Sequence, residues 1–299
     1  MNILALDIGG TAIKYGLCDE RGTLTRRGEC PTQAQLGGRH IVQTVQRIVE
    51  EYPEADAVGI ATAGTVDTRD GHIVYATDNI PGYTGTPLGQ LVSQSCGKPV
   101  CVENDVHAAA LGELAWGDGQ KLHSFLFLTV GTGIGGAFVS EGQLHRGFRG
   151  MAGYFGHMPV HPGGRLCTCG QRGCFEAYAS TTALLNRVRE LTGDSITGRA
   201  LFARIVADRV LQECFEQWIG ELTSGVVTLV NAYDPEAVIL GGGIMEQPIV
   251  IEVLRSRVTE QLPALTRNVL IRASGLGNSA GMLGAAYMAR RKFSGMEEG

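Results

Sequence analysis

Short apolar runs separated by glycine-rich turns open the chain. Residues 2–8, 12–19 and 23–30 are rich in aliphatic and β-branched side chains, and the turns GGT and ERG lie between them. Apolar runs bounded by turn residues predict strands, so we expect an antiparallel meander here. Apolar residues then recur at helical spacing over residues 40–52, which predicts an amphipathic helix.

The next apolar runs, residues 56–64 and 99–105, predict buried strands. A helix is predicted over residues 106–117, and either of two polar residues at the end of the preceding strand, Asn104 or Asp105, can cap it.

The same scheme starts again near Lys121, with a strand, the glycine turn GTGIGG and a second strand. Helical and strand periodicities then alternate to the end of the chain. The predicted elements are strands over 125–130 and 137–142, helices over 181–193 and about 207–232, a strand within 236–245 that runs into three glycines, a helix, a strand over 268–274 and a helix over 279–291.

The chain has 299 residues, enough for one large or two ordinary domains, and no low-complexity linker divides it. We therefore expect two lobes around one cleft, residues 1–118 and 119–279. A helix near residues 280–293 is expected to pack back on the first lobe.

Composition excludes several classes of partner. The 25 basic and 30 acidic residues give a net charge of −5, so the chain lacks the positive field that nucleic acids and anionic membranes attract. No run reaches the roughly 18 apolar residues of a membrane span. The first residues, MNILALDIGG, lack the pattern of a signal peptide. We expect a cytoplasmic protein with reduced cysteines.

Glycine-rich turns suggest phosphate binding. GTGIGG fits the G-x-G-x-x-G dinucleotide fingerprint, but a strand-like segment follows it instead of the required helix. Hairpin turns with glycine and threonine can present N–H groups and hydroxyls to phosphate oxygens, and Asp7 can hold Mg²⁺ through water. Each turn alone could be an ordinary hairpin, with Asp7 as a turn residue. Two such turns together with LGGGI favour phosphate binding.

One loop carries a candidate metal site. His157, Cys167, Cys169 and Cys174 supply one imidazole and three thiolates, a set suited to tetrahedral Zn²⁺. A disulfide and a chance cluster of thiols are the alternatives, and reduced surroundings and the short Cys167–Cys169 spacing argue against a disulfide. Four protein ligands leave no open position, so the metal would be structural.

The other five cysteines lie in or beside apolar runs, which is typical of small core residues. A nucleic-acid zinc ribbon is a competing interpretation of the loop. Only Arg165 and Arg172 inside it could contact phosphates, which disfavours this interpretation.

The chain resembles the ROK family of sugar kinases and sugar-responsive repressors over nearly its whole length. LALDIGGTAIK, VCVENDVHAAALGE, LTVGTGIGG, the His/Cys loop and VILGGGI occur in that family's order and spacing. The resemblance implies an α/β fold of the two-lobed actin-like (ribonuclease-H-like) type, closing on ATP and a sugar, with the zinc-binding loop 157–174 in the second lobe. By position it assigns the ATP contacts to Asp7, Gly9, Gly10, Thr11, Thr132, Gly133, Gly241 and Gly242.

Phosphoryl transfer to a hydroxyl needs a carboxylate that accepts the departing proton. Asp105 follows a strand and opens a helix, although a helix cap is a common role for such a residue. The resemblance makes Asp105 the base. It places Gly64, Asn79, Asn104, Asp105, His157 and Glu176 at the sugar, with His157 using the ring nitrogen that does not bind zinc. Metal loss should then impair substrate affinity as well as stability.

Two positions depart from the family pattern. Tyr154 stands in AGYFGH where the family usually has a glutamate that binds sugar hydroxyls, and Ala12 stands where it often has lysine. A phenol cannot act as a bidentate anionic acceptor. We therefore expect different hydroxyls to be recognised, or a bulkier or glycosylated sugar to be accommodated.

The function that this resemblance implies is ATP-dependent phosphorylation of a hexose, hexosamine or related glycoside, at the 6-hydroxyl. A repressor is disfavoured because the first strand starts by Ile3, which leaves no room for an N-terminal helix-turn-helix. A catalytically silent sugar sensor is disfavoured by the intact END motif (Glu103, Asn104 and Asp105) and favoured by Tyr154. Family members often form homodimers, and the sugar, the nucleotide preference and the oligomeric state are left open.

Overall fold

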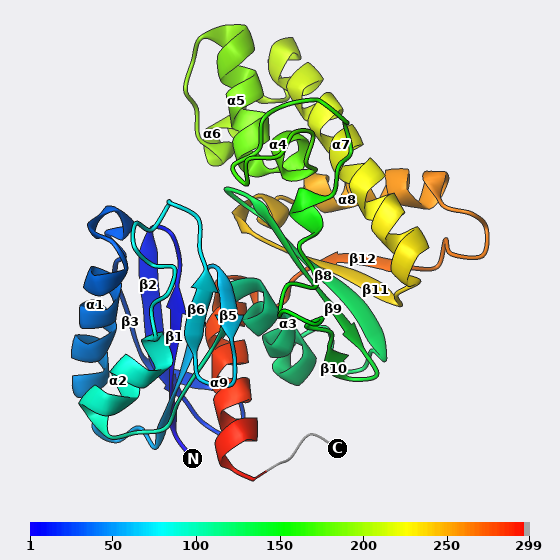
Figure 1. The fold of residues 1–299 in the computed structure, drawn as a ribbon. Coiled ribbons are helices and arrows are strands. Elements are labelled where there is room, and N and C mark those ends of the chain that lie inside the picture. Colours follow the sequence, from blue (N-terminus) through cyan, green and yellow to red (C-terminus); the bar gives the residue numbers. More distant parts are fainter. Residues whose placement is uncertain (296–299) are drawn as a thin grey trace. The chain divides into compact units, whose positions relative to one another are not determined.

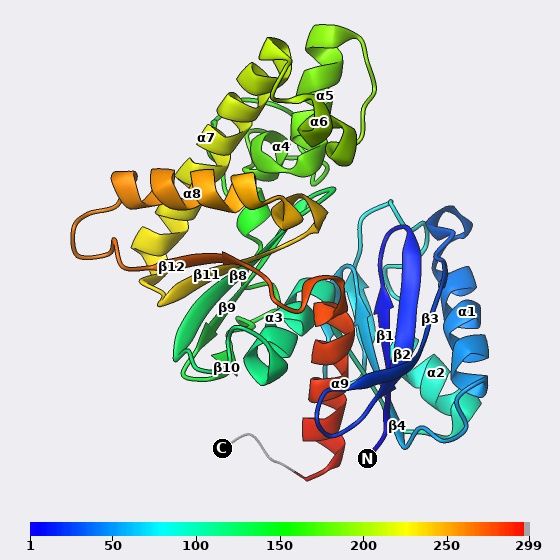
Figure 2. The ribbon, with the colours of Figure 1, turned by 180° about the vertical axis from the view of Figure 1, so that it is seen from behind.

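The computed structural model describes residues 1–295, which fall into two compact units. The N-terminal unit comprises Met1–Lys121, Leu144–Ala152 and residues 279–295, and the C-terminal unit comprises Leu122–Gln143 and Gly153–Asn278. Leu144–Ala152 thus belongs to the N-terminal unit, whereas the sequence boundaries placed it in the second lobe. Figures 1 and 2 show the elements of both units from opposite sides.

The sheet of the N-terminal unit has the strand order β3-β2-β1-β4-β7. Its first three strands form the antiparallel meander that the sequence predicted, and β4 and β7 continue it parallel to β1. A small hairpin of β5 and β6 was not predicted. The strands are β1 (Ile3–Ile8), β2 (Ala12–Cys18), β3 (Leu24–Pro31), β4 (Ala57–Thr62), β5 (Thr65–Asp67), β6 (His72–Tyr75) and β7 (Val100–Asn104).

Helices cover both faces of this sheet: α1 and α2 lie on one side, and α3 and α9 on the other (Figures 1 and 2). Glycines allow α9 to pack closely. A Cβ on Gly59 of β4 would lie 2.1 Å from the carbonyl oxygen of Ala285, and one on Gly284 would lie 1.5 Å from that of Ala108. The helices are α1 (Gly38–Glu50), α2 (Leu88–Cys96), α3 (Asp105–Trp116) and α9 (Ala280–Phe293).

The C-terminal unit is built on a second sheet of order β10-β9-β8-β11-β12, in which β8, β11 and β12 are parallel. Helices α7 and α8 pack on it through a continuous apolar core. Its elements are β8 (Ser124–Val130), β9 (Ile134–Ser140), β10 (Gln143–Leu144), β11 (Ala237–Gly241), β12 (Leu270–Ala273), α4 (Glu176–Ala179), α5 (Thr181–Thr192), α6 (Gly198–Arg204), α7 (Arg209–Tyr233) and α8 (Pro248–Gln261). Its short 3₁₀ helices are η2 (Phe155–His157) and η3 (Gly243–Glu246), while η1 (Ala34–Leu36) belongs to the N-terminal unit and η4 (Gly277–Ser279) lies at the boundary of the two units in the sequence.

The long helix α7 begins slightly later than its periodicity suggested. Asp208 is its N-cap and accepts hydrogen bonds from the backbone N–H groups of Val210 and Leu211 at 3.1 and 3.2 Å. Further along, the buried Trp218 donates its indole N–H to the carbonyl of Ala179 at 2.9 Å. That bond ties α7 to α4. Within residues 1–295, no helix combines the length and the apolar character that crossing a bilayer would require.

Candidate functional site

Two carboxylates of the N-terminal unit lie at the same edge of its sheet. Strands β1, β4 and β7 are parallel, with Asp7 in register with Ala61 and Thr62 in register with Asn104. Asp7 near the end of β1 and Asp105 just after β7 therefore flank the end of β4. In open α/β sheets, ligands bind at the carboxyl ends of the strands.

The turn between β7 and α3 fixes the orientation of Asp105. Asn104 is the N-cap: its Oδ1 accepts from the N–H groups of Val106 and His107 at 3.0 and 3.1 Å. Its Nδ2 donates to Oδ1 of Asp105 at 2.9 Å and to the carbonyl of Gly64 at 3.0 Å. Of the two capping residues that the sequence allowed, Asn104 is the one that caps. The second carboxylate oxygen of Asp105, Oδ2, takes no part in these bonds.

Burial makes both carboxyls unusually basic. It raises the pKa of Asp105, and it raises the pKa of Asp7 to about 7, with the nearby Asp105 carboxylate adding to the shift and Lys14 opposing it. The first turn of α9 also touches Asp7, because a Cβ on Gly281 would lie 2.7 Å from its Oδ2. Perturbed carboxyls at a strand edge are typical of catalytic or cation-binding groups.

Asp7→Asn should stabilise the protein much more at pH 8 than near pH 4.5. The pKa of Asp7 rises from 3.8 to about 7 on folding, so the folded chain binds this proton more tightly than the unfolded chain. Stability is then lost as the pH rises from about 4 to about 7, and it stays low above that range. Asparagine carries no such penalty, and we expect a gain of up to about 4 kcal/mol at pH 8. Urea unfolding at both pH values tests this, and an equal difference at both would contradict it.

A buried ionic network supports the same turn, and sequence reasoning missed it. The Glu103 carboxylate accepts from Nε and Nη2 of Arg146, both at 3.0 Å, and from the N–H of Asn104 at 3.0 Å. His107 Nδ1 lies 3.5 Å from Glu103, and its Nε2 lies 2.8 Å from the carbonyl oxygen of Ala152. Burial alone would raise the pKa of Glu103, but the contacts with His107 and Arg146 lower it. The i,i+4 spacing of glutamate and histidine was the available signal.

The first predicted phosphate turn joins β1 to β2. The N–H of Gly9 donates to the carbonyl of Ala12 at 3.0 Å, and the Thr32 hydroxyl donates to the Gly9 carbonyl at 2.6 Å. These bonds hold the base of the turn, while Gly10 and Thr11 at its tip are exposed.

The second predicted phosphate turn, Gly131–Gly133, joins β8 to β9 in the C-terminal unit. Gly242 lies beside it with φ 104°, and a Cβ there would be 2.2 Å from the carbonyl oxygen of Val130. Gly241 ends β11, the parallel neighbour of β8. Gly133, Gly241 and Gly242, three of the glycines that the resemblance assigned to the nucleotide, thus meet at one edge of this sheet, with Thr132 exposed among them.

The predicted metal ligands come together within this unit. The ligand atoms of His157, Cys167, Cys169 and Cys174 all lie within 4.8 Å of one another. Cys167 Sγ is 3.7 Å from His157 Nδ1, and the sulfurs of Cys169 and Cys174 are 3.6 Å apart. A tetrahedral zinc site with Zn–S bonds of about 2.3 Å separates its sulfurs by about 3.8 Å, so the residues could hold Zn²⁺. A disulfide would need about 2.05 Å.

Residues 157–174, here called the metal loop, need glycine to follow their tight path. Gly173 has φ 83°, and a Cβ there would lie 1.8 Å from the carbonyl oxygen of His161. His161 in turn contacts Glu221 of α7, with its Nε2 2.9 Å from Glu221 Oε2.

Two residues expected to contact sugar have informative surroundings. Glu176 accepts from the N–H of Ile134 at 2.9 Å and from the Thr168 hydroxyl at 3.0 Å. Both oxygens of its carboxylate therefore accept hydrogen bonds from the protein. Asn79 lies exposed in the segment between β6 and α2.

The comparisons with known proteins decide the family. Residues 3–292 match the profile of the ROK family. This chain is a member of the ROK family. The glucokinase of Thermotoga maritima is 32% identical over 315 residues, covering 99% of each chain. The N-acetylmannosamine kinase of Vibrio cholerae is 33% identical over 245 residues, covering 82% of this chain and 84% of the relative.

The ROK fold is also evident from solved structures. A ROK family glucokinase from Streptomyces griseus, crystallised in complex with glucose and AMPPNP, superimposes with a TM-score of 0.86 at 33% identity and covers 97% of this chain and 100% of its own. The predicted α/β fold of the actin-like type is confirmed, and the structure builds it on two main sheets.

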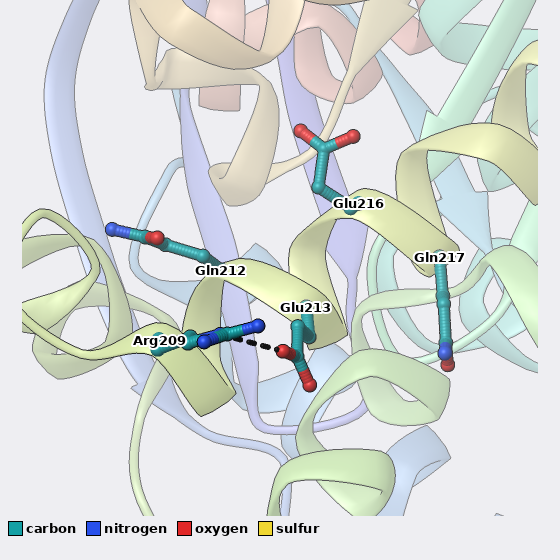
Figure 3. Close-up of a pocket in the computed structure, with 5 residues that line it drawn as sticks. All are labelled: Arg209, Gln212, Glu213, Glu216 and Gln217. Carbon is teal, nitrogen blue, oxygen red and sulfur yellow. Dashed lines mark hydrogen bonds and ion pairs between the residues drawn. The ribbon is translucent and has the colours of Figure 1, made fainter.

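A hollow in the C-terminal unit is lined by other residues. Arg209, Gln212, Glu213, Glu216 and Gln217 line it along the outer face of α7 (Figure 3). Arg209 Nε is 3.1 Å from Glu213 Oε1, which makes an ordinary i,i+4 ion pair on an exposed helix. The hollow contains none of the predicted site residues.

Proposed function

We propose that this ROK protein, an ATP-dependent sugar kinase, phosphorylates the 6-hydroxyl of a hexose, hexosamine or related glycoside, with Asp105 as general base. The observation that carries the proposal is the geometry of Asp105. Asn104 fixes its Oδ1, burial raises its pKa, and the residue lies at the carboxyl edge of the sheet beside Asp7. A general base works best when its pKa approaches the working pH.

In this reaction the Oδ2 atom of Asp105 takes the proton of the sugar hydroxyl. The hydroxyl oxygen forms a bond to the γ-phosphorus of ATP, and the bond from that phosphorus to the bridging oxygen breaks to release ADP. Asn104 makes its own four hydrogen bonds within the protein, so its chief contribution is to hold Asp105 in place.

The glycine turns of both units would hold the nucleotide. Backbone N–H groups and threonine hydroxyls would bind its phosphates, and Asp7 would hold Mg²⁺, which neutralises phosphate charge when bound. The proposed nucleotide contacts are Asp7, Gly9, Gly10, Thr11, Thr132, Gly133, Gly241 and Gly242.

The proposed sugar contacts are Gly64, Asn79, Asn104, Asp105, His157 and Glu176. Zn²⁺ on the metal loop would be structural and would fix His157, whose Nδ1 faces Cys167. Tyr154 lies near the same residue, with ring centroids 5.7 Å apart. We expect the phenol of Tyr154 to change which sugar hydroxyls the protein recognises.

The protein is expected to act in the cytoplasm, where ATP is available. Its expected homodimerisation can be tested by light scattering.

A coupled ADP-release screen tests the function. Glucose, mannose, N-acetylmannosamine, fructose, allose and β-glucosides are the substrates to compare, with the product position read by ³¹P-coupled NMR. Turnover of at least one, with phosphate on the 6-oxygen, is expected. No turnover with any of them would favour a sugar sensor.

A further inference from the structure

Glu176 makes hydrogen bonds with two separate parts of the C-terminal unit. Its Oε2 accepts from the N–H of Ile134 at 2.9 Å, at the end of the glycine turn. Its Oε1 accepts from the Thr168 hydroxyl at 3.0 Å and lies 3.7 Å from the Cys167 sulfur. One carboxylate therefore bridges the Gly131–Gly133 turn and the metal loop.

Glu176 and Thr181 support the Gly131–Gly133 turn. A Cβ on Gly133 would lie 2.2 Å from Glu176 Oε2, so the turn and the carboxylate are in direct contact. Gly131 is held from the same side, because its carbonyl accepts from the N–H of Thr181 at 2.9 Å. Both supports flank the short helix α4, which starts two residues after the metal ligand Cys174.

We propose that Glu176 is a positioning residue that transmits the state of the metal loop to the phosphate-binding turn, so that metal occupancy sets the affinity for the nucleotide. This rests on the proposed function in one respect, that the Gly131–Gly133 turn binds ATP phosphates. With the metal bound, Cys167 is fixed, and the adjacent Thr168 hydroxyl orients the carboxylate. Without it, Glu176 loses that restraint and the Ile134 N–H loses its fixed acceptor.

The metal loop offers a matched control for this coupling. Glu221 of α7 also contacts the loop, because it lies 2.9 Å from His161 Nε2. It is on a different helix from Glu176, and its contact is with His161 and not with the Gly131–Gly133 turn. Glu221→Ala removes a carboxylate from the loop in the same way as Glu176→Ala, and it leaves the bond to Ile134 intact. A general loosening of the loop would affect both variants alike.

The experiment measures AMP-PNP binding with Mg²⁺ and without sugar, by isothermal titration calorimetry. The wild type, Glu176→Ala, Thr168→Val and Glu221→Ala are each compared in zinc-loaded and chelated form. Chelation should raise the wild-type Kd about tenfold, since a buried amide loses its partner. Loaded Glu176→Ala and Thr168→Val should already bind weakly and should change little on chelation. Glu221→Ala should behave like the wild type.

Hydrogen exchange of the peptide that contains Ile134 gives a readout independent of nucleotide. Its amide protection should fall in chelated wild type and in loaded Glu176→Ala, but not in loaded Glu221→Ala. Thr168→Val keeps all four metal ligands, so its result stands even if the chelated chain unfolds. Wild-type Kd values in both loaded variants would overturn the coupling. Absence of AMP-PNP binding by the loaded wild type would instead overturn the proposed function.

Discussion

Asp105→Asn should lower kcat by about 10²- to 10⁴-fold and leave the Kd for AMP-PNP within about twofold of wild type. Asparagine has the same size, and its amide oxygen can still accept from the N–H of Val106, a bond of 2.9 Å in the wild type. It cannot take a proton from the attacking hydroxyl. The loss should therefore fall on the chemical step, which a coupled ADP-release assay and calorimetry separate.

The pH profile of wild-type activity gives a second test of Asp105. Burial raises the pKa of Asp105, and a protonated carboxyl cannot act as a base, so wild-type activity should fall as the pH drops through that raised value. Because Asp7 and Asp105 interact, the acid limb belongs to the pair. Asp56→Asn, just before β4 at the opposite edge of the sheet, is the matched control and should keep normal turnover. Near-normal turnover of Asp105→Asn would remove Asp105 from the role of base.

The surroundings of three carboxyls near the β7–α3 turn shift their pKa values in different directions. The pKa values of Asp7 and Asp105 are raised mainly by burial, whereas contacts with His107 and Arg146 lower that of Glu103. Glu103 therefore stays ionised and anchors the β7–α3 turn, while Asp105 becomes a stronger base. Neighbouring acids whose pKa values are shifted apart commonly have different roles in catalysis.

Local sequence patterns were enough to predict most of the strands and the cluster of candidate metal ligands, but not the β5–β6 hairpin. Apolar runs bounded by glycine turns predicted the meander β1–β2–β3, and the spacing of four ligands within 18 residues predicted a cluster that the structure brings together. Such features depend on neighbours along the chain. From the sequence, Asn104 and Asp105 could both cap helix α3. In the structure Asn104 is the cap, because its backbone has the non-helical angles φ −59° and ψ 143°.

Contacts between distant residues could not be predicted in this way. Arg146 reaches Glu103 across 43 positions, and Gly281 of the last helix touches Asp7 of the first strand. Nothing in the local pattern of either segment identifies its partner. The same holds for Glu176, whose position after Cys174 suggested a sugar contact but whose hydrogen bond to Ile134 spans 42 positions.

The metal loop should account for much of the stability of the C-terminal unit. Cys167 and Cys174 are buried, but Leu166 of the loop is 65% exposed, and Met158 and Val160 are only partly buried against the apolar core. In such loops the free energy of metal binding is free energy of folding. Three thiols gathered within 4.8 Å without a cation would also repel one another on ionising, which a bound dication reverses.

Cys174→Ser should therefore lower the unfolding free energy by at least about 4 kcal/mol and the melting temperature by about 10 °C. A serine hydroxyl is a poor zinc ligand, and the three remaining ligands would leave the site open. Calorimetric melting with and without a chelator, alongside zinc content by mass spectrometry, measures the effect. Wild type should lose stability on chelation, and Cys174→Ser should respond little because it has already lost the metal. Cys96→Ser, a half-buried cysteine of the other unit, should melt and respond to chelation as the wild type does. Wild-type melting of a zinc-free Cys174→Ser protein would show that the loop folds on its own.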